Sequence, residues 1–182
     1  MSFVSTGMVK HAIYLRKLEL RQRPRQSVRP PDLPLHIMEN KAPELSFYQY
    51  LIQTIGGESG WGNQSNELGT CQFTSSAHRL IVVYLSGNPC GLAELIQLNS
   101  QTVEIKHFGL IPSARHQKIG KYFFNWILHH CWSDTLDKMT LTHSDWDHPA
   151  AKAIFLRSGF VLSEEYIVQR SMPASFVPPL WS

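Results

Sequence analysis

The segment from Val103 to Phe124, VEIKHFGLIPSARHQKIGKYFF, combines basic side chains with a pattern suited to anion binding. An apolar run typical of a strand is followed by a short turn and then by an amphipathic helix. The first amides of a helix lack hydrogen-bond partners and lie at the positive end of its dipole, so a helix that begins near a strand end attracts anions. We therefore expect this segment to bind phosphate or pyrophosphate.

The turn resembles the coenzyme-A-binding motif of the GNAT superfamily of N-acetyltransferases. In that family a glutamine or arginine, two residues, a glycine, one residue and a glycine or alanine form the pyrophosphate loop. The corresponding series here is Arg115, His116, Gln117, Lys118, Ile119 and Gly120, with Lys121 next. Lys118 replaces a glycine, which would take a positive φ at no steric cost. We predict that Lys118 does not take the left-handed backbone conformation of a glycine and instead offers its ammonium group to the phosphate.

A second segment, HPAAKAIFLRSGF from His148 to Phe160, is similar to the other GNAT signature at every position of its spacing. Pro149 suits the first turn of a helix, and Gly159 suits the left-handed residue that ends one. The resemblance implies that His148, Ala151 and Phe155 contact the cofactor. His148 replaces an asparagine that contacts the pantetheine arm or the acetyl region, and an imidazole can also act as an acid.

The chemistry of acetyl transfer requires the attacking amine to lose a proton. Glu104 lies eleven residues before Arg115, where the histone-acetylating members of the family carry their general-base glutamate. The resemblance thus implies that Glu104 is the base, and Glu94 is a second candidate. An equal alternative is that Glu104 pairs with Lys106 or a neighbouring strand.

The resemblance also implies a site for the thioester carbonyl, polarised by the backbone amides of Phe108, Gly109 and Leu110. Gly109 has the alternative reading of a β-bulge. Phe155 occupies the position of a tyrosine that often protonates the leaving thiolate. Tyr122, Tyr166 or water must then supply that proton, unless the thiolate leaves unassisted.

Other chemistry-bearing residues carry no metal or disulfide pattern. His107, His129, His130 and His143 lack ligand spacing, and the three cysteines form no CxxC pair, so we expect no metal and no disulfide. Asp147 is expected to cap the helix that follows it. The aromatic residues Tyr48, Tyr50 and Trp61 either line an acceptor pocket or belong to the core.

The composition fits one domain over residues 1–182, with an N-terminal strand and a proline-rich connector in residues 1–34. The chain has 182 residues, of which 43% are hydrophobic and 17% charged, enough for a substantial core. No apolar run reaches the ~20 residues of a membrane span, and no secretory signal is evident, so the expected location is the cytoplasm.

The net charge is +3, and basic residues gather at Arg16, Lys17, Arg21, Arg23, Arg25 and Arg29. A solvated strand edge explains this cluster better than a nucleic-acid patch, because no recognition helix or interleaved aromatics accompany it.

The periodicity predicts strands at 11–20, 35–39, 79–85, 91–98, 101–110, 139–142 and 161–170. It predicts helices at 44–55, at 117–132 and after Pro149, with a short helix within 58–76 and frayed residues 1–10. This order implies the α/β GNAT fold, a mixed and mostly antiparallel sheet of about six to seven strands flanked by about four helices.

The resulting hypothesis is an N-acetyltransferase that moves an acetyl group from acetyl-CoA, its co-substrate, directly to an unidentified small-molecule or peptide amine. A homodimer is a possible assembly. The pieces FYQYL, IGG, FGLIP and DHPAA resemble an uncharacterised bacterial subgroup of the superfamily. The alternatives are a coenzyme-A-binding module without catalysis and a nucleic-acid-binding protein that uses the basic N-terminus.

Overall fold

The computed structural model describes residues 7–61 and 76–181, which hold seven strands and three α-helices. The elements are β1 (Met8–Leu20), β2 (Leu35–Asn40), α1 (Leu45–Gly56), β3 (His78–Leu85), β4 (Asn88–Asn99), β5 (Thr102–Leu110), α2 (Ile119–His130), β6 (Lys138–Ser144), α3 (Pro149–Arg157) and β7 (Val161–Pro173), with a short 3-10 turn at Pro112–Ala114. The mixed α/β architecture is confirmed. About four helices were expected, and the described residues contain three. Most of the segment where a fourth was expected, 58–76, falls outside them.

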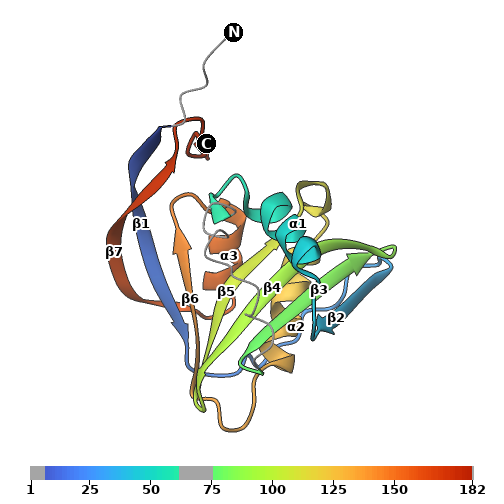
Figure 1. Ribbon diagram of the computed structural model, residues 1–182. Coiled ribbons are helices and arrows are strands. Elements are labelled where there is room, and N and C mark those ends of the chain that lie inside the picture. The colour runs from blue at the N-terminus through green and yellow to red at the C-terminus, as the bar shows by residue number, and fades with distance from the viewer. Residues whose placement is uncertain (1–6, 62–75, 182) are drawn as a thin grey trace.

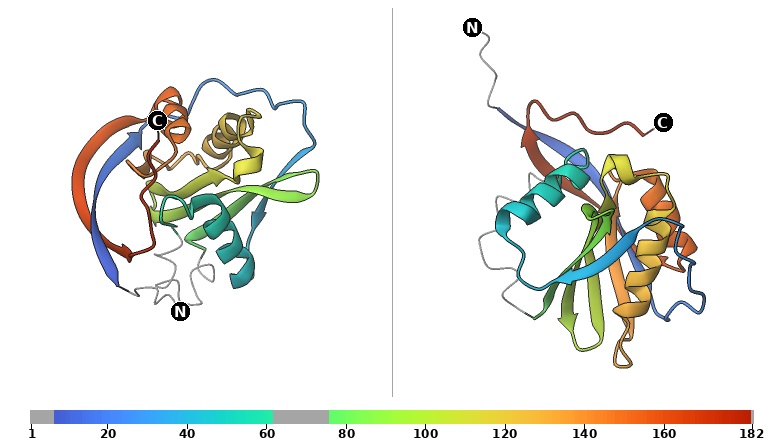
Figure 2. Two further views of the ribbon diagram at one scale, coloured as in Figure 1. Left: turned by 90° about the horizontal axis from the view of Figure 1, so that it is seen from above. Right: turned by 90° about the vertical axis from the view of Figure 1, so that its right-hand side faces the viewer.

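All strands form one sheet in the order β2-β3-β4-β5-β6-β1-β7, in which only the β5–β6 pair is parallel. Helices α2 and α3 cover one face, and α1 lies on the other (Figures 1 and 2). The apolar stripe of α1 predicts that one face of this helix packs on the sheet. Leu51 and Ile52 on that face are buried against Leu80 and Val82 of β3.

The central feature for function is the separation of β5 from β6. Their pairing runs only from Thr102 beside Lys138 to Ile105 beside Leu141. Beyond Ile105 the two strands have no mutual ladder, and Figure 1 shows them diverging toward α3. A register shift on β5 follows at once, since Ile105 pairs with Leu95 and His107 with Glu94. Lys106 is thus the bulged residue.

The first strand, β1, lies inside the sheet between β6 and β7. Its predicted existence is confirmed, but the prediction that residues 8–10 are frayed is wrong, because Met8 pairs with Pro173. The solvated edge expected for the basic residues is also wrong for β1, which has a partner on each side.

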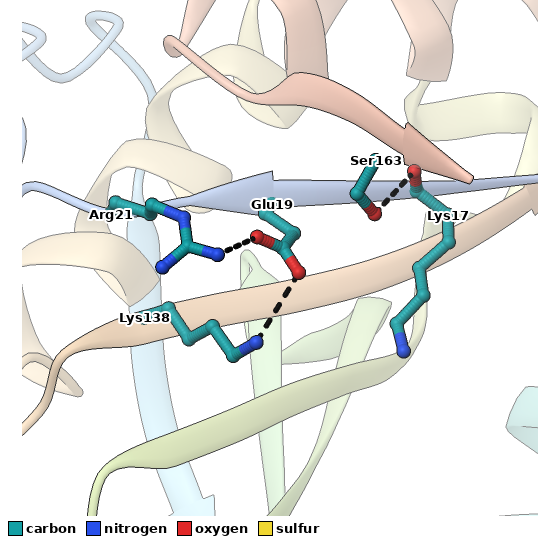
Figure 3. Close-up of polar contacts among 5 residues, drawn as sticks. All are labelled: Lys17, Glu19, Arg21, Lys138 and Ser163. Atoms are coloured by element: carbon teal, nitrogen blue, oxygen red, sulfur yellow. Dashed lines mark hydrogen bonds and ion pairs between the residues drawn. The ribbon is translucent and has the colours of Figure 1, made fainter.

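Polar contacts fasten β1 to both neighbours (Figure 3). The Glu19 carboxylate accepts hydrogen bonds from Arg21 at 2.7 Å and from Lys138 of β6 at 3.2 Å. Ser163 of β7 donates its hydroxyl to the Lys17 carbonyl at 3.1 Å, where the β1–β7 register shifts. These contacts tie β1 to β6 through Lys138 and to β7 through Ser163.

The connector after β1 follows the outer surface of α2. The Val28 amide donates to the Asn125 side chain at 2.8 Å, and the Asn125 amide donates to the Gln26 carbonyl at 3.1 Å. Arg23 donates to the His129 carbonyl at 2.9 Å. Part of the basic cluster is therefore engaged inside the molecule.

Candidate active site between the separating strands

A cavity of about 290 Å³ occupies the space where β5 and β6 diverge. It brings together most of the residues that the sequence analysis assigned to the cofactor. Those that line it are Phe108, Gly109, Leu110, Arg115, His116, Lys118, Gly120, Lys121, His148, Ala151 and Phe155. Gln117, Ile119 and Glu104 are not among its lining residues.

One end of the cavity is formed by the N-terminus of α2. Lys118 precedes the helix with φ at 63° and no side chain caps the first amides. The prediction that a lysine here would avoid a left-handed backbone is wrong. His116 also has a positive φ of 64°. A non-glycine residue in this region costs about 1–2 kcal/mol, and the surrounding fold holds both residues there.

The two loop residues outside the cavity have structural contacts instead. Ile119 is fully buried in the core below α2. The Gln117 amide donates to the Ser113 carbonyl at 3.0 Å and closes the loop.

The cations at this end supplement the helix dipole. Arg115, Lys118 and Lys121 line the cavity, and α2 has no acidic residue in its first turn. Arg115 lies 3.7 Å from Glu58, its nearest anionic partner among the described residues. Unpaired amides with three cations nearby are suited to binding an anion, as the sequence analysis expects of this segment.

The middle of the cavity runs along β5. An added Cβ at Gly109 would come within 2.5 Å of Ile55 on α1, so close packing of α1 requires the glycine. The alternative reading of Gly109 as a bulge is wrong, because the bulge is at Lys106. Gly109 pairs with Leu92 on one side, and its other side faces the space that β6 has left.

Trp61 forms one wall of the cavity, and the sequence offered no periodic partner for it. Its indole N–H donates to the Asp147 carboxylate at 3.3 Å, and its ring lies 4.7 Å from the His107 ring. The Asp147 carboxylate also accepts the Ser144 amide at 2.7 Å. Burial raises the pKa of Asp147, although the hydrogen bonds from Ser144 and Trp61 oppose this.

His148, not Asp147, caps α3, so the capping prediction for Asp147 is wrong. The His148 Nδ1 accepts the Ala150 amide at 3.2 Å. Burial, with the nearby Arg115 and His116, lowers the pKa of His148. Trp181, which sequence reasoning missed, also lines the cavity and lies 4.7 Å from the His148 ring.

Phe155, where a tyrosine was expected from the signature, packs its ring against Phe124 at 5.0 Å and Phe108 at 6.0 Å. Neither of the alternative proton donors, Tyr122 and Tyr166, lines this cavity.

A buried polar network lies behind Lys106 and Trp61, on the α1 face of the sheet. Glu94 has no exposed surface, and its carboxylate accepts the Tyr48 hydroxyl and lies beside His107 Nδ1, each at 2.7 Å. The Lys106 Nζ lies 3.6 Å from the Glu94 Oε1. Burial alone would raise the pKa of Glu94, but the hydrogen bond and charge of His107, with Lys106 and Tyr48, lower it overall.

Among the aromatic residues considered for an acceptor pocket, Tyr48 is therefore a core residue, and Tyr50 is half exposed. Trp61 alone of these three lines the cavity.

Glu104 lies on the other side of the divergence, on the face of the sheet opposite α2. It lines a second cavity with Lys17, Thr140, Thr142 and Tyr166, among others. Thr142 lines both cavities. The alternative in which Glu104 pairs with Lys106 is not observed, since Lys106 pairs with Glu94. The role of Glu104 stays a prediction.

No group of three or more histidine, cysteine, aspartate or glutamate side chains among the described residues is arranged to hold a metal ion. No helix within 7–61 and 76–181 has the length and apolarity needed to cross a membrane. Cys90 and Cys131 are buried free thiols, and Cys71 lies outside the described residues.

The fold is of the GNAT class: a mixed sheet whose parallel pair diverges beside a cationic helix N-terminus. The family model described as the acetyltransferase (GNAT) family matches residues 44–160, well over half of the chain, so the chain belongs to that family. No curated protein matches.

Solved structures share the fold at low sequence identity. A functionally unknown conserved protein from Staphylococcus epidermidis ATCC 12228 matches with a TM-score of 0.63 and 17% identity, over 88% of this chain and 62% of its own. A GCN5-related N-acetyltransferase from Kribbella flavida matches with a TM-score of 0.59 and 13% identity, over 93% of this chain and 61% of its own. A GNAT family acetyltransferase from Elizabethkingia anophelis with acetyl-CoA bound matches with a TM-score of 0.53 and 13% identity, over 71% of this chain and 78% of its own. The chain spans about three fifths of the first two proteins.

Proposed function

We propose that this protein is an acetyl-CoA-dependent N-acetyltransferase that transfers the acetyl group directly to an amine. The observation that carries the proposal is the single cavity joining the cationic N-terminus of α2 to the unpaired side of β5. A diphosphate at the first position would extend the pantetheine arm along Leu110 and Gly109 toward Phe108. The acetyl-CoA complex of the Elizabethkingia anophelis relative supports the choice of cofactor.

The acceptor amine would approach from the α1 face, opposite the helices that enclose the cofactor. Thr142 lies at the boundary between the two cavities, and Glu104 lines the one on the acceptor side. In this proposal Glu104 takes the amine proton, directly or through water, while the backbone amides of β5 stabilise the developing oxyanion. The nitrogen then attacks the thioester carbon, and coenzyme A leaves as its thiol.

The cofactor assignment is tested by isothermal titration of coenzyme A and of pantetheine, which lacks the diphosphate. Arg115→Ala removes a cation that lines the cavity, and Arg157→Ala, an exposed residue of α3 away from the cavity, is the matched control. Because a hydrogen bond to a charged group contributes about 1.5–3 kcal/mol, Arg115→Ala should weaken coenzyme A by about tenfold or more and leave pantetheine nearly unchanged. Equal losses for both ligands would refute the diphosphate assignment.

The main rival is a coenzyme-A-binding module without catalysis, favoured by Phe155 at the position of a proton-donating tyrosine. Thiol release from acetyl-CoA, corrected for hydrolysis and measured with a panel of amines, antibiotics and peptides, separates the two. Acceptor-dependent release supports the enzyme, whereas coenzyme A binding without release supports the module. The same panel identifies the acceptor.

A further inference from the structure

His143, on the diverging part of β6, is a buried histidine at the cavity with one ring nitrogen unused. The residue is 5% exposed and lines the cavity. Its Nδ1 lies 3.1 Å from the Ser144 carbonyl oxygen. Its Nε2 is buried and has no hydrogen-bond partner within residues 7–61 and 76–181. A buried polar atom without a partner costs about 1–3 kcal/mol, so it calls for an explanation.

The hydrogen-bond geometry fixes the tautomer. A carbonyl oxygen only accepts, so the proton is on Nδ1 and the unpartnered Nε2 of the neutral ring is an acceptor. Charged groups face this ring from three directions: Asp147 from the following loop, Arg16 from β1 and Lys152 from α3. Burial, with Arg16 and Lys152, lowers the pKa of His143 against the opposing effects of Ser144 and Asp147. The neutral, accepting ring is therefore the form present near pH 7.

His143 lines the cavity just beyond the point where the pairing of β6 with β5 ends. Leu141 is the last residue of β6 that pairs with β5, and His143 follows two residues later on the same face. That face packs toward α2 and α3, as Leu141 and Phe155 of the same core cluster show. His148, the other cavity histidine with a shifted pKa, uses its Nδ1 to cap α3 and lies near Arg115 at the phosphate end.

We infer that His143 carries the proton between the acceptor amine and the sulfur of coenzyme A. As the nitrogen attacks, a C–N bond forms and the C–S bond breaks. One proton passes from the amine nitrogen to Nε2 by relay through Glu104, and then from Nε2 to the thiolate. The ring ends neutral, and the product thiol donates its S–H to Nε2. This inference rests on the proposed function and assigns the acid that Phe155 cannot supply.

The first experiment needs no acceptor amine. Nitrogen-15 NMR of the histidine-labelled full chain is recorded with coenzyme A and with desulfo-coenzyme A, which lacks the thiol. The His143 Nε2 resonance should report an unprotonated nitrogen in the free protein and shift on adding coenzyme A, but shift far less with the desulfo compound. A protonated Nε2, or equal shifts with both compounds, would overturn the inference. If coenzyme A itself does not bind the wild-type chain, the proposed function fails instead.

The second experiment uses turnover with the best amine of the panel. His143→Gln keeps a hydrogen-bonding side chain of similar size but cannot carry a proton, and His36→Gln on the exposed strand β2 is the control. General acid–base catalysis contributes about 10²–10⁴-fold, so His143→Gln should lower kcat by about that factor. It should also remove the fall in rate at low pH that protonation of Nε2 causes, while coenzyme A affinity stays within about twofold. Unchanged kcat and pH profile would contradict the inference.

Discussion

The contact between Gly56 and Trp61 makes the most direct test of how the cavity wall is held. An ideal Cβ at Gly56 would lie 2.0 Å from Cδ2, 2.1 Å from Cε3 and 2.4 Å from Cγ of the Trp61 indole. The ring cannot easily retreat, because its N–H is bonded to Asp147 and it is in tilted contact with the His107 ring. Gly56→Ala therefore forces the indole out of place.

Two effects of opposite sign set the magnitude. Overpacking of this kind costs about 1–3 kcal/mol. Gly56 ends α1, where replacing glycine with alanine without strain would stabilise the protein by about 0.4–1 kcal/mol. The net expectation is a loss of about 1–2 kcal/mol in the free energy of unfolding. For a chain of this size that lowers Tm by about 2–8 °C.

The assay is urea unfolding followed by far-UV circular dichroism. Gly120→Ala is the matched control, since its Cβ would meet only Ile154 and Leu110, at 3.4 Å or more, and should be neutral or stabilising. In a Trp61→Leu background the penalty of Gly56→Ala should largely disappear, which a double-mutant cycle would show as coupling of about 1 kcal/mol or more. A Gly56→Ala protein as stable as the wild type, or an equal penalty without the indole, would refute the packing argument.

Three further outcomes follow from the site. Lys118→Gly relieves the left-handed strain at φ 63°, so its stability should equal or exceed that of the wild type by up to about 1 kcal/mol, whereas its coenzyme A affinity, by titration calorimetry, should fall. Glu104→Gln should lower turnover and shift its pH profile with acetyl-CoA affinity nearly unchanged, and unaltered turnover across pH would remove the base assignment. Because the folded-state pKa of Glu94 is lowered from 4.5, its contribution to stability is present above pH 4.5 and is lost as pH falls through the folded value. Urea unfolding from pH 7 to pH 3 should show this loss in the wild type and a smaller one in Glu94→Gln.

Local signals in the sequence predicted the elements and most of the residues that line the cavity. The strand, turn and helix around Arg115 depend on short-range patterns, as does the helix that Pro149 begins and Gly159 ends. Gly159 has φ at 95°, the left-handed value that the signature requires. Because the two signatures are continuous segments, each can be recognised from neighbouring residues alone, and together they supply most of the cavity lining.

Features that depend on contacts between distant segments could not be predicted in the same way. The Glu94 network joins residues from α1, β4 and β5, and Tyr48 and His107 are 59 positions apart in the chain. The absence of a described hydrogen-bond partner for the His143 Nε2 is likewise set by residues that are distant in the sequence. The one available signal was a set of polar residues inside apolar strands, which predicts that partners exist but not which ones. The prediction for the Lys118 backbone was wrong for another reason: the surrounding structure imposes a conformation that a lysine disfavours.

The position of β1 changes how the nucleic-acid alternative must be examined. Deleting residues 1–30 would remove a strand that pairs with both β6 and β7, so any loss of binding in the deletion would report unfolding and not a missing contact surface. Arg25 and Arg29 are exposed on the connector and have no ion pair among the described residues. Replacing both with alanine leaves the sheet intact and removes two exposed charges of the basic cluster. A steep salt dependence of binding that persisted in that double variant would point to another cationic surface, and the Arg115 end of the cavity is the next one to test.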